Sequence, residues 1–216
     1  MTRSNDQSFS DRDPAGERAP ADRRAAARDA KRERILDAAV VEIAHHGYHH
    51  TTVAMIARRA GVADGTIYLY FRDKEEVLVS LFERAMGRFI EEGQRRLPAG
   101  GSAATRLRRI VELHLALLGR DRDLAVIMQV ELRHSLRFLD LFSRSRMRDY
   151  LATIAEVVGE GQREGAFRAD LDPLLAAKMV FGVLDELATD WVLSKRNSRL
   201  SAKAKAASDL ILRGLA

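Results

Sequence analysis

Three hydroxyl-bearing side chains, those of Thr66, Tyr68 and Tyr70, fall within a five-residue segment of this sequence. If the segment forms a short helix, Ile67 and Phe71 face inward and leave these three side chains on the other side. A hydroxyl group both donates and accepts hydrogen bonds, so this side is suited to contact a polar partner. The segment thus predicts an apolar anchor on one side and hydrogen-bonding groups on the other.

The residues before this segment predict a helix and a tight turn that would position it. A helix over residues 53–60 is predicted by apolar residues at the spacing of one helical face: Val53, Ile56, Ala57 and Ala60. Thr52 stands at the N-cap position, and Gly61 can adopt a positive φ in the turn that follows. Two short helices joined by such a turn form a helix-turn-helix, whose second helix enters the major groove of DNA.

The stretch GVADGTIYLYFRDKEEVL resembles the signature of the TetR family of bacterial repressors. The resemblance implies an all-α fold of about nine helices, with an N-terminal three-helix helix-turn-helix DNA-binding domain and a C-terminal helical domain for ligand binding and dimerisation. It also implies a homodimer on a palindromic operator in double-stranded DNA, because one short recognition helix offers too few contacts for tight binding. The residues that match the family's DNA-contacting positions are Thr52, Gly65, Thr66, Tyr68, Tyr70 and Lys74.

Composition excludes several other classes of protein. The absence of cysteine excludes a disulfide framework and thiolate chemistry. No apolar run approaches the ~18 residues needed to cross a bilayer, and the N-terminus lacks the apolar core of a signal peptide. We therefore expect a cytoplasmic protein with no membrane partner.

The net charge of +5 is unevenly distributed along the chain. Residues 31–80, which hold the helix-turn-helix, carry seven basic and seven acidic side chains. Residues 81–150 carry fourteen arginines against nine acids, and they account for the whole excess. DNA binding must then depend on where the charges point, and an anionic ligand is one explanation for the arginine surplus.

Helical periodicity and breaks in the sequence divide the chain into three parts. We expect a disordered N-terminal arm over residues 1–28, a DNA-binding domain over 29–80 and a ligand-binding and dimerisation domain over 81–216. The arginines of the arm either touch DNA or are simply solvated. The helices expected besides 53–60 span residues 30–46, 64–71, 74–97, 103–119, 122–134, 137–162, 172–194 and 201–214. The resemblance places the dimer interface on the last two of these helices.

Over about residues 33 to 194, the sequence further resembles the FadR-type repressors of fatty-acid degradation within the TetR family. The segments that carry this likeness include LAVIMQVELRHS and MVFGVLDELATDWV. Such repressors release DNA when they bind long-chain acyl-coenzyme A, so the resemblance implies this effector and no cofactor.

A long acyl chain requires an apolar tunnel between helices, and the coenzyme A phosphates require cations at its mouth. The candidates for the tunnel, most of which could equally be ordinary core, are Leu113, Leu117, Met128, Val130, Leu132, Phe138, Phe181 and Leu184. Polar candidates within or beside it are His114, Gln129 and Glu131. The cations expected at the mouth form two clusters without compensating acids nearby in sequence, Arg106, Arg108 and Arg109 and then Arg144, Arg146 and Arg148.

Three alternatives to a repressor that responds to acyl-coenzyme A are considered from the sequence: another effector, an enzyme and a metal site. The effector could be a free fatty acid or a cationic drug, with the repressor controlling efflux or lipid genes; acids in the pocket would favour the drug. An acyl-thioester enzyme is disfavoured because the sequence contains no nucleophile elbow, cysteine or recognisable acid–base pair, so we expect no catalytic residue. A metal site is also not expected, because Gly47 separates His45 from His49 and no acid or cysteine completes a ligand set.

Overall fold

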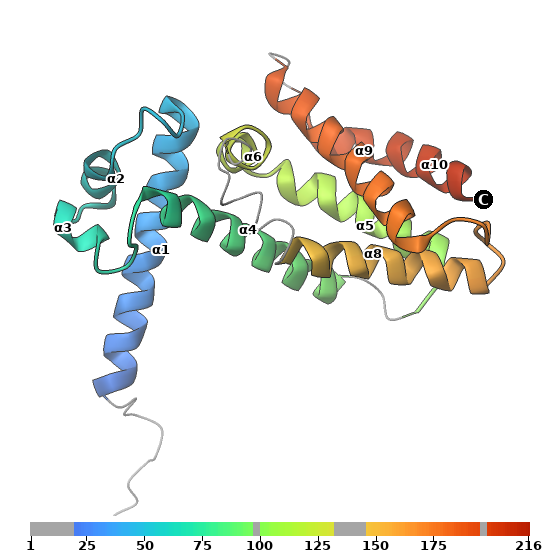
Figure 1. Ribbon diagram of the computed structural model, residues 1–216, viewed down its shortest axis with the longest axis horizontal. Helices are drawn as coiled ribbons and strands as arrows, with labels where there is room; N and C mark the ends of the chain where they lie inside the picture. The colour runs from blue at the N-terminus through green and yellow to red at the C-terminus, as the bar shows by residue number, and fades with distance from the viewer. Residues whose placement is uncertain (1–19, 97–99, 132–145, 195–197) are drawn as a thin grey trace, which may run out of the picture.

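The computed structural model describes residues 20–96, 100–131, 146–194 and 198–216 (Figure 1). These residues form nine α-helices and one 3-10 helix, and they contain no β-strand. The elements are α1 (Pro20–His46), α2 (Val53–Ala60), α3 (Asp64–Ile67), α4 (Lys74–Arg96), α5 (Ala103–Leu118), α6 (Arg122–Gln129), α8 (Arg146–Arg163), α9 (Pro173–Leu193), η2 (Leu200–Lys203) and α10 (Ala204–Leu215). The predicted all-α fold is confirmed.

The predicted helix-turn-helix is formed by α2 and α3. The Thr52 hydroxyl caps α2 by accepting a hydrogen bond from the Met55 amide at 3.2 Å. Gly61 ends the helix in the left-handed conformation, with φ 65°, which a residue with a Cβ adopts only under strain. Both ends of α2 are therefore specified by local chemistry.

The second helix is shorter than predicted. We expected it to continue through Phe71, but α3 ends at Ile67, and the amides of Leu69 and Tyr70 bond the carbonyls three residues back. Ile67 and Phe71 are nonetheless buried as expected. Burial of these two side chains anchors the turn without a continuous helix.

The first helix is longer than predicted. We assigned residues 1–28 to a disordered arm, but α1 begins at Pro20, so residues 20–28 are helical. Proline is favoured in a first helical turn, and alanine and arginine are strong helix formers, so local propensity supports this start without any apolar periodicity. The blocks of Arg and Ala in this segment, Arg23-Arg24 and Ala25-Ala26-Ala27, carry this propensity.

The larger C-terminal bundle is built around α5. This helix contacts α4, α6, α8, α9 and α10, which explains why its sequence is apolar on more than one face. Side-chain N-caps start three of the bundle's helices, with Ser102 on α5, Asp121 on α6 and Asp172 on α9. No helix in the described ranges is both long enough and apolar enough to cross a membrane.

Two helices of the bundle reach the N-terminal unit. Helix α4 packs on α1 as well as on α5 and α8, and α6 packs on α1 as well as on α9. Figure 1 shows α4 crossing from the three-helix unit into the bundle. Contacts of α4 and α6 with α1 therefore join the C-terminal bundle to the N-terminal unit.

Candidate nucleic-acid interface and candidate ligand pocket

The outward side of the helix-turn-helix presents the predicted side chains. Tyr68 is 58% exposed, and Thr66 is partly exposed beside it. A Cβ added at Gly65 would meet nothing within 4 Å, so the backbone there is open to close approach. Leu69 is 72% exposed on the same turn, an apolar contribution to this surface that the sequence analysis did not identify.

Tyr70 is half-buried, and the Arg28 guanidinium carbon lies 5.9 Å from its ring centroid. This is a cation–π distance, and it joins the N-terminal part of α1 to the turn after α3. Thr52 is exposed, but its hydroxyl already caps α2. Contacts of these residues with DNA stay predictions.

Lys74 occupies a structural position. Its ammonium donates to the carbonyl oxygens of Tyr48 (2.7 Å) and Thr51 (2.8 Å), and lies 4.4 Å from the Tyr48 ring centroid. Burial lowers the pKa of Lys74 below its ordinary value. The side chain thus closes the loop between α1 and α2, and a phosphate contact by Lys74 also stays a prediction.

The two arginines of α2 differ in their surroundings. Arg59 pairs with the buried carboxylate of Glu42, so it holds α2 against α1. Arg58 is exposed, and none of the described residues forms an ion pair with it. Of the two, Arg58 is the one available to a phosphate.

A buried aromatic cluster lies where α4, α5, α8 and α9 meet. His114 Nδ1 and the Tyr150 hydroxyl are 2.8 Å apart, and both residues are buried. The rings of Phe89 and Phe181 pack edge-on against this pair. Burial lowers the pKa of His114 to about 4 and raises the pKa of Tyr150 above its ordinary value, so the pair is a neutral hydrogen bond at neutral pH.

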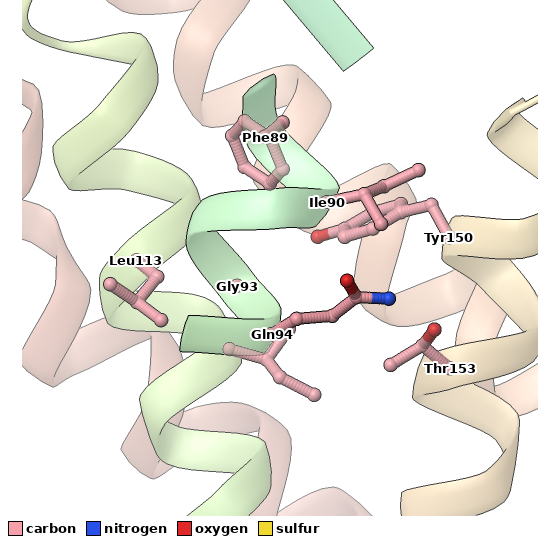
Figure 2. Close-up of a pocket in the computed structure, with 8 residues that line it drawn as sticks. Phe89, Ile90, Gly93, Gln94, Leu113, Tyr150 and Thr153 are labelled. Carbon is pink, nitrogen blue, oxygen red and sulfur yellow. The ribbon is translucent and has the colours of Figure 1, made fainter. Parts of the chain in front are cut away.

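A small apolar pocket adjoins this cluster. Its lining comes from α4, α5 and α8: Phe89, Ile90, Gly93, Gln94, Ile110, Leu113, Tyr150 and Thr153. Figure 2 shows the side chains of Ile90 and Gln94 directed from α4 toward Tyr150 and Thr153 of α8. The cavity volume is about 40 Å³, well below the ~300–1,000 Å³ typical of ligand pockets.

The predicted ligand residues are distributed differently from the expectation. Leu113 lines the pocket, and His114 supports it through Tyr150. Leu184 is fully buried core, and Phe181 packs behind the lining against Tyr150. Leu117, Met128 and Val130 are partly buried and do not belong to this lining. Leu132, Phe138 and Arg144 lie outside the described residues.

All three arginines of the first cluster have acid partners, and the expectation that no acid lies nearby in sequence is wrong for Arg109 alone. Arg106 pairs with Glu160, Arg108 pairs with Asp209 at 2.7 Å, and Arg109 pairs with Glu112 at 3.1 Å. The first two of these acids come from distant helices, α8 and α10. Tertiary packing thus supplies the partners that the local sequence lacks.

Two polar residues of α6 and the loop after it have structural contacts. Gln129 is buried, and its side-chain oxygen accepts a hydrogen bond from the Thr189 hydroxyl of α9 at 3.0 Å. Glu131 accepts a hydrogen bond from the Tyr48 amide at 2.8 Å. A carboxylate following α6 therefore holds the loop that leads into the helix-turn-helix.

The histidines around Gly47 serve as surface contacts rather than as a cluster. His45 lies 3.5 Å from Asp123 of α6, and His46 lies 3.5 Å from Glu42. Across the described ranges, no group of three or more His, Asp or Glu side chains is placed to hold a metal ion.

An apolar face on α9 and α10 is open to solvent. Its most exposed members are Leu175 (53%), Met179 (65%) and Leu210 (70%). They border a groove of about 320 Å³ between the two helices. An apolar face of this kind on a folded chain indicates an interaction surface.

Several residues of the pocket were missed in the sequence analysis. Gly93 could have been identified from the sequence, because a glycine inside a helix lowers helix stability by about 1 kcal/mol relative to alanine. Gly93 also follows Phe89 by one helical turn. Tyr150 carried none, since its partner His114 is distant in sequence and on another helix.

Both halves of the sequence match known families. Residues 35–81 match the family described as bacterial regulatory proteins, tetR family, and residues 82–214 match the C-terminal region of YsiA-like proteins. The fatty acid metabolism regulator protein of Bacillus subtilis is 39% identical over 181 residues, which cover 84% of this chain and 93% of that protein.

Two solved structures extend the similarity to the fold. The fatty acid degradation regulator FadR from Bacillus halodurans superposes with a TM-score of 0.80 at 40% identity, covering 93% of this chain and 98% of that one. The transcriptional regulator FadR from Bacillus subtilis, in complex with stearoyl-CoA, gives a TM-score of 0.80 at 38% identity over 85% and 99% of the two chains.

Proposed function

Because this chain belongs to the TetR family of bacterial regulatory proteins, we propose that it is a DNA-binding repressor of fatty-acid degradation (β-oxidation) genes that leaves its operator on binding long-chain acyl-coenzyme A. One observation carries the effector: a relative in complex with stearoyl-CoA is 38% identical and is matched over 99% of its length. The likeness therefore includes the C-terminal bundle as well as the DNA-binding unit. As a DNA-binding regulator, the protein would act in the cytoplasm.

The pocket between α4, α5 and α8 supports an acyl chain as the ligand. Its lining is almost entirely apolar, and the hydroxyl of Tyr150, the buried polar residue of the lining, is satisfied by His114 behind it. No carboxylate is among the lining residues, so a cationic drug would find no counter-charge there. These features favour a fatty acyl group over the drug.

The small size of the pocket suggests how binding would reach the DNA. A volume of about 40 Å³ cannot hold a long acyl chain, so the chain must move α4 away from α5 or α8. The same helix holds α1, because Arg84 bonds Asp37 at 2.7 Å and Arg88 bonds Glu33 at 2.9 Å. Displacing α4 would then turn the DNA-binding unit, and two recognition helices would no longer fit successive major grooves.

Among the predicted cations, Arg109 is the better candidate for the coenzyme A phosphates. Its pair with Glu112 is exposed on both sides, and such pairs contribute only about 0–1 kcal/mol, so a phosphate displaces the acid at little cost. Arg106 is more buried and ties α5 to α8 through Glu160. We assign Arg106 to bundle stability.

The exposed apolar face of α9 and α10 supports the homodimer. Two copies placed face to face would bury Leu175, Met179 and Leu210 from each chain in a four-helix contact. A dimer also provides the two recognition helices that a palindromic operator requires.

The test combines operator release with a blocked pocket. A duplex enriched from a random library by the full-length protein is bound, and stearoyl-CoA, stearate and coenzyme A are added separately. We expect release by stearoyl-CoA and none by coenzyme A; release by stearate alone would identify a free fatty acid as the effector. Failure of every acyl compound to bind or release would refute the effector assignment.

Gly93 provides the matched variants for this test. A Cβ at this position meets nothing within 4 Å, so Gly93→Ala should leave binding intact and stabilise α4 by about 1 kcal/mol. Gly93→Leu should fill the pocket and abolish release while operator binding persists. Normal release from Gly93→Leu would exclude this pocket as the acyl site.

A further inference from the structure

The N-terminal part of α1 lies outside the matched family region. The family match begins at residue 35, whereas α1 begins at Pro20. In Figure 1 this first half of α1 continues well past α2 and α3. Residues 22–30 are all exposed, so this stretch of helix is not required to complete the core of the DNA-binding unit.

Acids and most of the cations lie on opposite sides of this part of α1, with Arg23 and Arg34 between the two sides. At about 100° per residue, Arg24, Arg28, Lys31 and Arg32 fall within an arc of about 100°. The acids Asp22, Asp29, Glu33 and Asp37 fall within an arc of about 80° on the opposite side. The acidic side faces α4, where Arg84 and Arg88 bond Glu33 and Asp37.

The basic side continues the face that packs on the helix-turn-helix. Further along α1, the residues on this line are Ile35 and Ala39, which are fully buried. Arg32 lies 5.1 Å from the Phe71 ring centroid, and Arg28 lies 5.9 Å from that of Tyr70. The cations are thus directed toward the turn that follows α3.

This arrangement forms an open groove of about 550 Å³ beside the recognition element. Its lining is Arg24, Ala27, Arg28, Lys31, Leu69 and Tyr70. No carboxylate belongs to the lining. Within the described part of the chain, Arg24, Arg28 and Lys31 form no ion pair with any acid.

The contrast with the C-terminal bundle is informative. There, Arg106, Arg108 and Arg109 are each neutralised by an acid. Arg24, Arg28 and Lys31, which have no acid partner among the described residues, lie next to the recognition turn, where the phosphate backbone of a bound duplex would run. Unpaired lysine and arginine side chains in a row are the means by which proteins neutralise DNA phosphates and release counterions.

We propose that the basic stripe of α1, formed by Arg24, Arg28, Lys31 and Arg32, binds the DNA phosphates that flank the bases contacted by α3. This inference rests on the proposed DNA-binding function and adds a second contact surface to it. The stripe carries no base-reading geometry, so it raises affinity for all sequences and leaves sequence preference to α3.

The test measures operator affinity against salt for variants of the full-length protein. The probe is a duplex enriched by the wild-type protein from a random library, with a second version extended by about one helical turn, or ten base pairs, at each end. For the triple variant R24Q/R28Q/K31Q, we expect the slope of log K against log salt to fall by up to about 5 per dimer, since each lost phosphate contact contributes about 0.9. The loss should be larger on the extended duplex and equal for specific and random DNA.

A matched pair of single variants separates position from charge. Arg28→Gln and Arg23→Gln remove the same charge from the same exposed helix, but Arg23 lies about 140° around the helix from Arg28. We expect the slope to fall by about 2 per dimer for Arg28→Gln and to remain unchanged for Arg23→Gln. Circular dichroism melting of each variant confirms that α1 remains folded.

The possible results are distinct. An unchanged slope and affinity in the triple variant would overturn the proposal, as would an equal effect of Arg23→Gln and Arg28→Gln. A variant that loses sequence preference while keeping its salt slope would also contradict a phosphate role. If the wild-type protein enriches no duplex at all, the proposed DNA-binding function itself fails. This result differs from failure of the stripe proposal, in which the wild-type protein binds DNA and the variants bind it equally well.

Discussion

The buried pair of His114 and Tyr150 predicts a specific dependence of stability on pH. Burial lowers the pKa of His114 from 6.5 to about 4 in the folded protein. Below pH 6.5 the unfolded chain binds a proton at this histidine that the folded chain does not bind, so stability falls as the pH falls toward 4 and the effect then levels off.

The magnitude follows from the two pKa values. The full effect is about 3 kcal/mol, because one pKa unit corresponds to about 1.4 kcal/mol. Between pH 7 and pH 5, the part attributable to His114 is about 2 kcal/mol. Other titrating groups add their own contributions, so a variant that cannot titrate is needed as the reference.

His114→Asn is that variant, since its amide keeps a polar atom near the position of Nδ1 and has no pKa in this range. The free energy of unfolding is measured by urea titration at pH 7 and pH 5, at one protein concentration because the protein is expected to be a dimer. The wild-type protein should lose about 2 kcal/mol more than His114→Asn over this interval. An equal loss in both proteins would show that His114 is not held neutral, and the reasoning from burial would be refuted.

Four further outcomes are expected. Tyr68→Ala should weaken operator binding about tenfold or more, because a base contact contributes about 1–3 kcal/mol, while its exposed position leaves the melting temperature unchanged; retained affinity would exclude Tyr68 from the interface. Gly61→Ala should destabilise the fold by about 1–2 kcal/mol, the cost of a left-handed residue with a Cβ, and thermal melting checks this. Glu131→Gln should weaken the hydrogen bond from the Tyr48 amide and so reduce the ratio of operator affinities measured without and with stearoyl-CoA. An unchanged ratio would show that the contact between Glu131 and Tyr48 does not transmit ligand binding to the DNA-binding unit. Met179→Glu should convert the dimer to a monomer in sedimentation, and a persistent dimer would place the interface elsewhere.

The helix-turn-helix could be predicted because its determinants are local. Thr52 caps α2 and Gly61 ends it, and both act on backbone groups within a few residues. The helical spacing of Ile67 and Phe71 predicts that both are buried, and both are, although the helix ends at Ile67. Short-range rules of this kind need no knowledge of the rest of the chain.

The start of α1 also depends on local propensity, without packing against a core. Residues 20–28 lack apolar periodicity, a feature that predicts an arm without structure, yet alanine and arginine favour a helix by propensity alone. Periodicity reports packing against a core, so it says nothing of a helix that projects from one. The tertiary structure identifies the basic stripe on this segment, because the opposite side of the helix bonds α4.

The sequence by itself determined the fold class, the position of the DNA-reading turn and the family resemblance, because these depend on caps, glycines and spacing along one helix. Only the tertiary structure decided which charges are free and where the pocket lies. Arg106 and Arg108 gain acids from α8 and α10, and His114 gains Tyr150 from α8. An ion pair or a pocket wall joins residues far apart in the chain, and the distance between their atoms is set by how the helices pack.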